Sequence, residues 1–115
     1  MSQFQFAKDR RGNILPFHTP SDLIYSQKLT ADTATDYTIP AGYNAVSISA
    51  TGTVYVKTDA TAKQPSGTLI TDGASINDNY LDVTNVTYVS IIGASGATPD
   101  VTLAFYQVNS LPNPP

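Results

Sequence analysis

The chain has 115 residues, a formal net charge of −3, 13% charged residues and no cysteine. This length suits a single domain, and the lack of cysteine excludes a disulfide framework, a thiolate nucleophile and a cysteine-based metal site. All nine acidic residues are aspartate, and threonine, serine, valine, isoleucine and tyrosine are abundant, a composition that favours strands over helices. We therefore expect an all-β protein.

Charge is unevenly distributed along the chain. Four basic residues precede Leu29 and outnumber two aspartates there, whereas two lysines after Leu29 face seven aspartates. The acidic body argues against nucleic-acid binding, which depends on neutralising phosphates with lysine and arginine. The first six residues lack the basic and apolar regions of a signal peptide, and no apolar run is long enough to span a bilayer. We expect a protein made in the cytoplasm, without a nucleic-acid or membrane partner.

Residues 1–30 are predicted to form an extended N-terminal arm. Pro16 and Pro20 interrupt any long ladder there, and apolar positions are sparse. Phe4 and Phe6 alternate with glutamines, and the polar segment 9–13 supplies a turn before a second apolar run. A small hairpin is therefore predicted within the arm.

Residues 31–110 are predicted to form a compact antiparallel β-sandwich, jelly-roll-like or Ig-like. Residues 36–39 are extended, and Pro40, Ala41 and Gly42 favour a turn. Valine, isoleucine and alanine alternate with serine along 45–50, as in a half-buried strand. After a reversal at Thr51-Gly52, residues 53–58 are predicted to be the hairpin partner of that strand.

The second half of the body contains further strand signals separated by turns. A loop is expected at 61–67, a short apolar strand at 68–71 and a turn at Asp72-Gly73. Residues 77–79 continue the irregular stretch, and the chain is expected to cross one end of the sheets around 80–83. Strands are then expected at 86–92 and at 101–108, with residues 93–100 as a hairpin loop between them. Residues 111–115 form a proline-rich C-terminal tail that cannot join a regular ladder.

No motif announces a catalytic centre, a cofactor or a metal ion. His18 is a single histidine without a recognisable nucleophile or orienting acid nearby in the sequence. Asp72, Asp78 and Asp82 could supply oxygen ligands to calcium, but their spacing does not fit an EF-hand, and aspartates are common turn residues. The glycines at 93 and 96 lack the lysine and helix of a phosphate-binding loop.

The segments Ile39–Gly42, 45–50 and 53–56, together with 89–92 and 101–106, resemble small proteins encoded beside the major capsid genes of tailed bacteriophages. The resemblance covers about residues 35–108. It implies a virion structural protein with a β-sandwich, a decoration or cement protein that binds the outer capsid surface and stabilises the assembled shell. It also implies the major capsid protein and further copies of the chain as partners, with a homotrimer favoured.

Under this hypothesis the arm reaches onto capsid subunits by strand addition, in which main-chain hydrogen bonds give affinity and alternate side chains give specificity. Six residues are the candidates for this contact: Phe4, Phe6, Arg10, Arg11, Ile14 and Phe17. The protein is then expected on the capsid surface of the virion, and no reaction is catalysed.

Two alternatives remain open from the sequence. The first is a receptor- or carbohydrate-binding module of a phage tail fibre or baseplate, which would use the loops between Asp72 and Asp82 and a face of exposed tyrosines. The candidate tyrosines are Tyr25, Tyr37, Tyr43, Tyr55, Tyr80, Tyr88 and Tyr106. The second alternative is a small enzyme, which would require a pocket with convergent polar groups and a strongly shifted pKa.

Overall fold

The computed structural model describes residues 6–8, 14–18 and 21–108. This part of the chain contains ten strands and no helix, so the all-β prediction is confirmed. The strands are β1 (Phe6–Lys8), β2 (Ile14–His18), β3 (Leu23–Lys28), β4 (Thr35–Thr38), β5 (Ala45–Ala50), β6 (Val54–Thr58), β7 (Ser75–Ile76), β8 (Tyr80–Asp82), β9 (Tyr88–Gly93) and β10 (Asp100–Tyr106).

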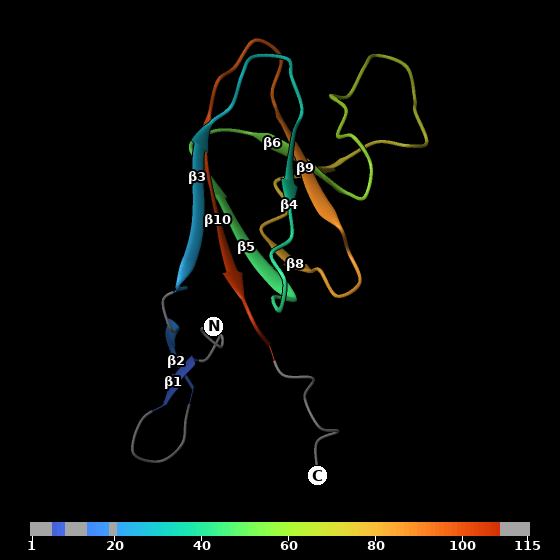
Figure 1. The fold of residues 1–115 in the computed structure, drawn as a ribbon. Coiled ribbons are helices and arrows are strands. Elements are labelled where there is room, and N and C mark those ends of the chain that lie inside the picture. Colours follow the sequence, from blue (N-terminus) through green and yellow to red (C-terminus); the bar gives the residue numbers. More distant parts are fainter. Residues whose placement is uncertain (1–5, 9–13, 19–20, 109–115) are drawn as a thin grey trace.

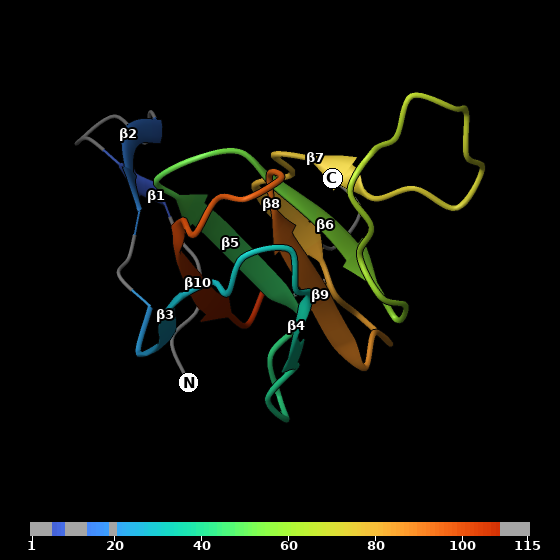
Figure 2. The ribbon, with the colours of Figure 1, turned by 90° about the horizontal axis from the view of Figure 1, so that it is seen from above.

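Eight of these strands form a β-sandwich with the connectivity of a jelly roll. One four-stranded sheet has the order β3-β10-β5-β8 and the other has the order β4-β9-β6-β7, and every neighbouring pair is antiparallel. Except between β6 and β7, the chain changes sheet at each step from β3 to β10, so the two sheets are interleaved (Figures 1 and 2). Of the two predicted sandwich types, the strand order selects the jelly roll.

The core lies between the inner faces of the two sheets. In β5 the alternation places Val46 and Ile48 inward, each 2% exposed, while Ser47 and Ser49 face outward. In β10 the inward positions are Val101, Leu103 and Phe105, and the register sets them against the inward residues of β3 and β5. A period of two in the sequence thus produces one apolar layer that both sheets share.

Aromatic rings close the sandwich where β3 and β4 form the two sheet edges. The ring of Tyr25 stands edge-on to Phe105 at 4.9 Å between centroids, and it also lies 6.5 Å from the ring of Tyr37. The Tyr37 hydroxyl donates to Gln27 Oε1 at 2.9 Å. This contact gives a buried hydroxyl a partner and joins β4 to β3 across the sheets.

Several turns depend on residues that tolerate a positive φ. Gly42 has φ of 86°, and Tyr43 N donates to Pro40 O at 3.3 Å, so 40–43 is the predicted turn with glycine at its third position. Asp32, Asp59, Asn77 and Asn85 also adopt positive φ. Aspartate and asparagine accept this conformation better than other residues with a Cβ.

Three local predictions were wrong. The strand over 54–58 exists, but it pairs with β9 and β7 in the opposite sheet and is not the hairpin partner of β5. Residues 94–99 likewise cross between sheets instead of forming a hairpin loop. Residues 68–71 form no strand, and Leu69 is 90% exposed.

The arm ends earlier than the predicted boundary at residue 30. β3 pairs with β10 over its whole length, and Leu29 is 1% exposed within the core. The apolar side chains of Leu23 and Tyr25 pack against this core, so the sandwich begins near Leu23. The C-terminal tail at 111–115 lies outside the described residues.

Candidate interaction surfaces

The first candidate surface is the N-terminal hairpin of β1 and β2. Phe6 is paired with His18 and Lys8 with Ile14, in an antiparallel two-stranded sheet that is separate from the sandwich. Figure 1 shows this hairpin beyond the start of β3, outside the two packed sheets. The hairpin predicted within the arm is therefore present.

The six candidate arm residues are distributed unevenly between described and undescribed parts of the chain. Phe6, Ile14 and Phe17 lie on β1 and β2, which places their backbone in the hairpin. Phe4, Arg10 and Arg11 lie outside the described residues. The structure thus brings the two apolar runs of the arm side by side, and the contact with a capsid stays a prediction.

The second candidate surface is formed by the long connection between β6 and β7, residues 59–74. It begins at Asp59, whose carboxylate accepts from Thr87 N at 2.8 Å and Tyr88 N at 3.2 Å. It then covers the outer face of β9, where Ala62 N donates to the Ser90 hydroxyl at 2.9 Å. Ser90 is fully buried, although it points away from the core, because this segment lies over it.

The same connection reaches the far end of the sandwich through Gln64. The Gln64 amide nitrogen lies 3.0 Å from Gly93 O and 3.0 Å from Asp32 Oδ1. Asp32 also accepts from Gly96 N at 2.9 Å. The hydrogen bond from Gly96 and then that from Gln64 lower the pKa of Asp32, so this carboxylate joins three loops in its ionised form.

The second half of the connection projects from the body (Figure 2) and returns at Asp72. Lys63 forms an ion pair with the Asp72 carboxylate, and Lys57 Nζ donates to Asp72 O at 2.6 Å. The Lys63 ammonium, which donates to the carboxylate, lowers the pKa of Asp72. Lys57, Lys63 and Asp72, hereafter the lysine clasp, therefore fix both ends of the projecting segment to each other and to β6.

A largely apolar groove of about 300 Å³ lies between this projecting segment and β6. Its floor includes Tyr55 of β6 and Ile76 of β7, and its walls come from the connection. Ile76 is 60% exposed and Ile70 is 36% exposed. The full lining is Tyr55, Lys63, Pro65, Ile70, Gly73, Ala74 and Ile76. A groove of this size fits one or two apolar side chains of a partner.

The tyrosines do not form the exposed face that a carbohydrate-binding module would use. Tyr37 and Tyr106 are buried, and Tyr80 is exposed on the outer face of the other sheet from Tyr55. Tyr25, Tyr43 and Tyr88 are half-buried, and Tyr43 donates its hydroxyl to Asp22 Oδ1 at 2.9 Å. Burial, followed by this contact with Asp22, raises the pKa of Tyr43.

The aspartates considered as calcium ligands are not gathered into one site. Asp72 belongs to the lysine clasp, and Asp82 accepts from Thr84 Oγ1 at 2.7 Å and Thr84 N at 2.9 Å, which lowers its pKa. Over the part of the chain that the structure describes, no three acidic or histidine side chains converge as metal ligands would. The side chain of His18 lies outside the described part of the chain. The described residues also contain no helix that is long and apolar enough to cross a membrane.

No family model, curated protein or solved structure matches this chain. Function therefore has to be inferred from the fold and from the two candidate surfaces.

Sequence reasoning missed the groove and the lysine clasp. Lys57 and Lys63 are the two lysines that follow Leu29, but both precede Asp72, by 15 and 9 positions, and no local signal in the sequence pairs them with it. No local signal predicted the groove either, because Tyr55 and Ile76 lie 21 positions apart in the sequence and meet only through the pairing of β6 with β7.

Proposed function

We propose that this chain is a structural protein of a tailed-phage virion, a decoration protein whose jelly-roll body sits on the outer capsid and whose N-terminal hairpin fastens it to capsid subunits. The main observation behind the proposal is that the β1-β2 hairpin forms a sheet of its own, apart from the two sheets of the sandwich. A two-stranded hairpin is marginally stable alone in water, and β1 and β2 join neither sheet of the sandwich. In the proposed complex the capsid surface packs against this hairpin, which pairs with neither sheet of the sandwich.

The charge distribution also supports the assignment of capsid attachment to the arm and not to the body. Residues 1–20 carry Lys8, Arg10 and Arg11 against Asp9, an excess of two positive charges, and the whole chain has a net charge of −3. Residues 21–115 therefore carry a net charge of −5. The arm is suited to an acidic surface, and the acidic body is repelled from it, so docking has a preferred orientation.

The proposed mechanism is mechanical and needs no chemical step. An arm that contacts two neighbouring capsid subunits adds interface that must be broken before the shell opens. Ordering the arm on the capsid costs conformational entropy. That cost is offset more easily when several arms of one oligomer bind together, because each later contact is effectively intramolecular.

The test compares the full chain with the variant Arg10→Glu/Arg11→Glu in binding to capsids of the encoding phage from which this protein has been removed. Co-sedimentation of the full chain, with at least about tenfold weaker binding of the variant, is the expected result. The matched control is Asp78→Lys/Asp82→Lys, which changes charge on the body and leaves the arm intact. Equal binding by the arm variant and the full chain would remove the arm from the interface.

A second candidate, a receptor- or carbohydrate-binding module of a tail fibre or baseplate, is favoured by the groove beside Tyr55. Jelly rolls include lectin domains, and an aromatic ring with a lysine nearby can hold a sugar ring. Binding of the isolated chain to a glycan array, abolished by Tyr55→Ala and retained by Tyr80→Ala, would support this candidate.

A further inference from the structure

The longest free sheet edge in the described part of the chain belongs to β3. Its six residues pair with β10 on one side, and no described strand pairs with the other side. The other edge strands of the sandwich, β4, β7 and β8, have four, two and three residues. A free edge presents unpaired backbone N–H and C=O groups that can bind another strand.

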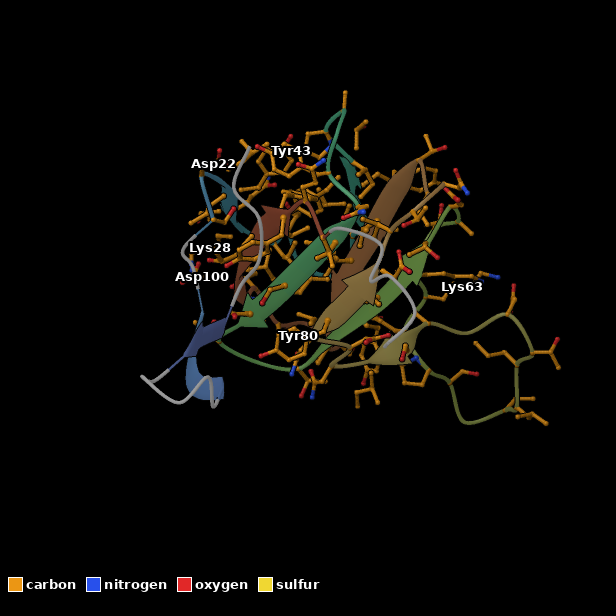
Figure 3. The ribbon with its side chains drawn as sticks, turned by 90° about the horizontal axis from the view of Figure 1, so that it is seen from below. Asp22, Lys28, Tyr43, Lys63, Tyr80 and Asp100 are labelled. Atoms are coloured by element: carbon orange, nitrogen blue, oxygen red, sulfur yellow. The ribbon has the colours of Figure 1, made fainter. Side chains whose placement is uncertain are left out.

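The outward side chains along this edge are Asp22, Ile24, Ser26 and Lys28. They alternate with Leu23 and Tyr25, which pack on the core. Ile24 is 51% exposed in the middle of the row, so a large apolar side chain on this edge is available to a partner strand. Lys28 and Asp22 carry opposite charges at the two ends of the row, and Figure 3 shows both on the side of the body away from Lys63.

This row is complementary to itself when reversed. In an antiparallel pair centred on Tyr25, Asp22 of one copy lies opposite Lys28 of the partner subunit, and Ile24 lies opposite Ser26 of the partner subunit. Moving the register by two residues places Asp22 opposite Thr30 or Ser26, and the charge pairing is lost. Opposite charges across an antiparallel pair stabilise it, and like charges destabilise it.

We propose that two copies of this chain form a two-fold dimer by antiparallel pairing of β3 with β3, centred on Tyr25, which joins the β3-β10-β5-β8 sheets into one continuous eight-stranded sheet. The occupant of the free edge is thus a second copy of the same strand. The two Ile24 side chains then lie diagonally across the new strand pair and cover each other.

The electrostatic row extends beyond the two strands. Lys28 Nζ already lies 2.9 Å from Asp100 Oδ1 on the neighbouring strand, and both side chains are more than half exposed. In the dimer, Lys28 stands between Asp100 and Asp22 of the partner subunit, so one ammonium faces two carboxylates. The same contact forms twice because the pairing is two-fold.

The antiparallel arrangement also relates the arm to the partner's acidic end. The arm leads into the start of β3, and residues 29–34, which include Asp32, follow its end. Pairing in opposite directions therefore brings the arm of each copy toward the loop 29–34 of the other. That end of the partner carries Asp32 and Asp100.

This inference does not depend on capsid binding, and a two-fold dimer differs from the trimer that the resemblance implies. Sedimentation equilibrium of the full chain distinguishes them, since the monomer mass is 12.2 kDa and the dimer has twice that mass. We expect a monomer–dimer equilibrium. A trimer, or a monomer at all accessible concentrations, would overturn the inference.

Charge reversal then tests the register. In the variant Asp22→Lys, positions 22 and 28 are both lysine, and in the variant Lys28→Asp both are aspartate. A homodimer of either variant therefore places like charges opposite each other, and each variant is expected to dimerise at least about tenfold more weakly than the full chain. Mixed together, the two variants restore both opposite-charge pairs. Native mass spectrometry of an equal mixture should detect the mixed dimer well above the share that random association gives. A mixture that contains the two variants in random proportions would contradict the proposed register.

A second pair of variants remains informative if a charge-reversed protein fails to fold. Ile24→Lys places a charge at the centre of the proposed interface. The control Tyr80→Lys places a charge outside the interface, on β8 at the opposite edge of the same sheet, where Tyr80 is 76% exposed. Only Ile24→Lys is expected to abolish the dimer. Loss of the dimer in both variants, or in neither, would overturn the proposal.

Discussion

Replacing Ser90 by alanine tests how the connection 59–74 is attached to the sandwich. Ser90 is fully buried on β9, and its hydroxyl accepts the hydrogen bond of Ala62 N at 2.9 Å. Ala62 is itself 3% exposed, so water cannot replace the lost acceptor. Leaving a buried donor unsatisfied costs about 1–3 kcal/mol, and we expect Ser90→Ala to lose this much free energy of unfolding.

The assay is thermal unfolding followed by circular dichroism, with urea unfolding as a second measure. In a domain of this size, 1 kcal/mol corresponds to a change of about 4–8 °C in Tm, so a decrease of at least about 4 °C is expected. The control is Ser49→Ala, because Ser49 is an exposed serine on β5, where substitutions usually change stability by no more than about 0.5 kcal/mol. Equal Tm values for the two variants would refute the proposed attachment.

Three further substitutions or conditions probe the core, a tight loop and the lysine clasp. A Cβ at Gly93 would lie 2.8 Å from Pro99 Cδ, so Gly93→Ala is expected to lower the unfolding free energy by about 1–3 kcal/mol in urea titration; a neutral effect would contradict the contact. Phe105→Ala removes a fully buried ring and should cost about 3–5 kcal/mol, whereas a loss below 1 kcal/mol would show that Phe105 is not central to the core. Because Lys63 lowers the pKa of Asp72, the stabilisation from the lysine clasp is fully present above the ordinary value of 3.8 and is lost as the pH falls through the lower folded value. Cleavage within residues 65–71 by pepsin should therefore increase as the pH falls from 4 to 2 in the full chain and be high at both pH values in Lys63→Met; a pH-independent rate in the full chain would argue against the clasp.

The positions of the strands could be predicted from the sequence far better than their partners. The alternation in 45–50 and 101–106 identified β5 and β10 and the side chains that they bury. Alternation shows which side chains face the core, but it does not show which of two sheets a strand joins. For that reason β6 was assigned to β5 as a hairpin partner, although both strands present their apolar faces to the same core from opposite sheets.

Two other differences have equally local causes. Leu69 and Ile70 form an apolar pair that favoured a strand, but neighbouring turns leave this segment without a ladder partner. Leu23 and Tyr25 have the spacing of a half-buried strand, but the apolar Ile24 between them obscures the alternation of apolar and polar residues. For this reason β3 falls within the predicted arm, residues 1–30. The free edge of β3 became visible only from the order of strands in the sheet.

The candidate surfaces were predictable in part. Polar residues around two short apolar runs predicted the hairpin of the arm, since turn chemistry is local. The groove and the lysine clasp depend on contacts between residues that are distant in the sequence, and no local pattern encodes them. Function in such a fold is therefore argued from individual surfaces and not from the jelly roll itself.

Cryo-electron microscopy of the phage particle that encodes this chain tests the central proposal most directly. We predict density for the jelly-roll body on the outer capsid surface, with residues 1–20 as the segment in contact with the major capsid protein. Density for the body at the tail tip or baseplate, or an arm directed into solvent above a body that itself contacts the capsid, would contradict the proposal.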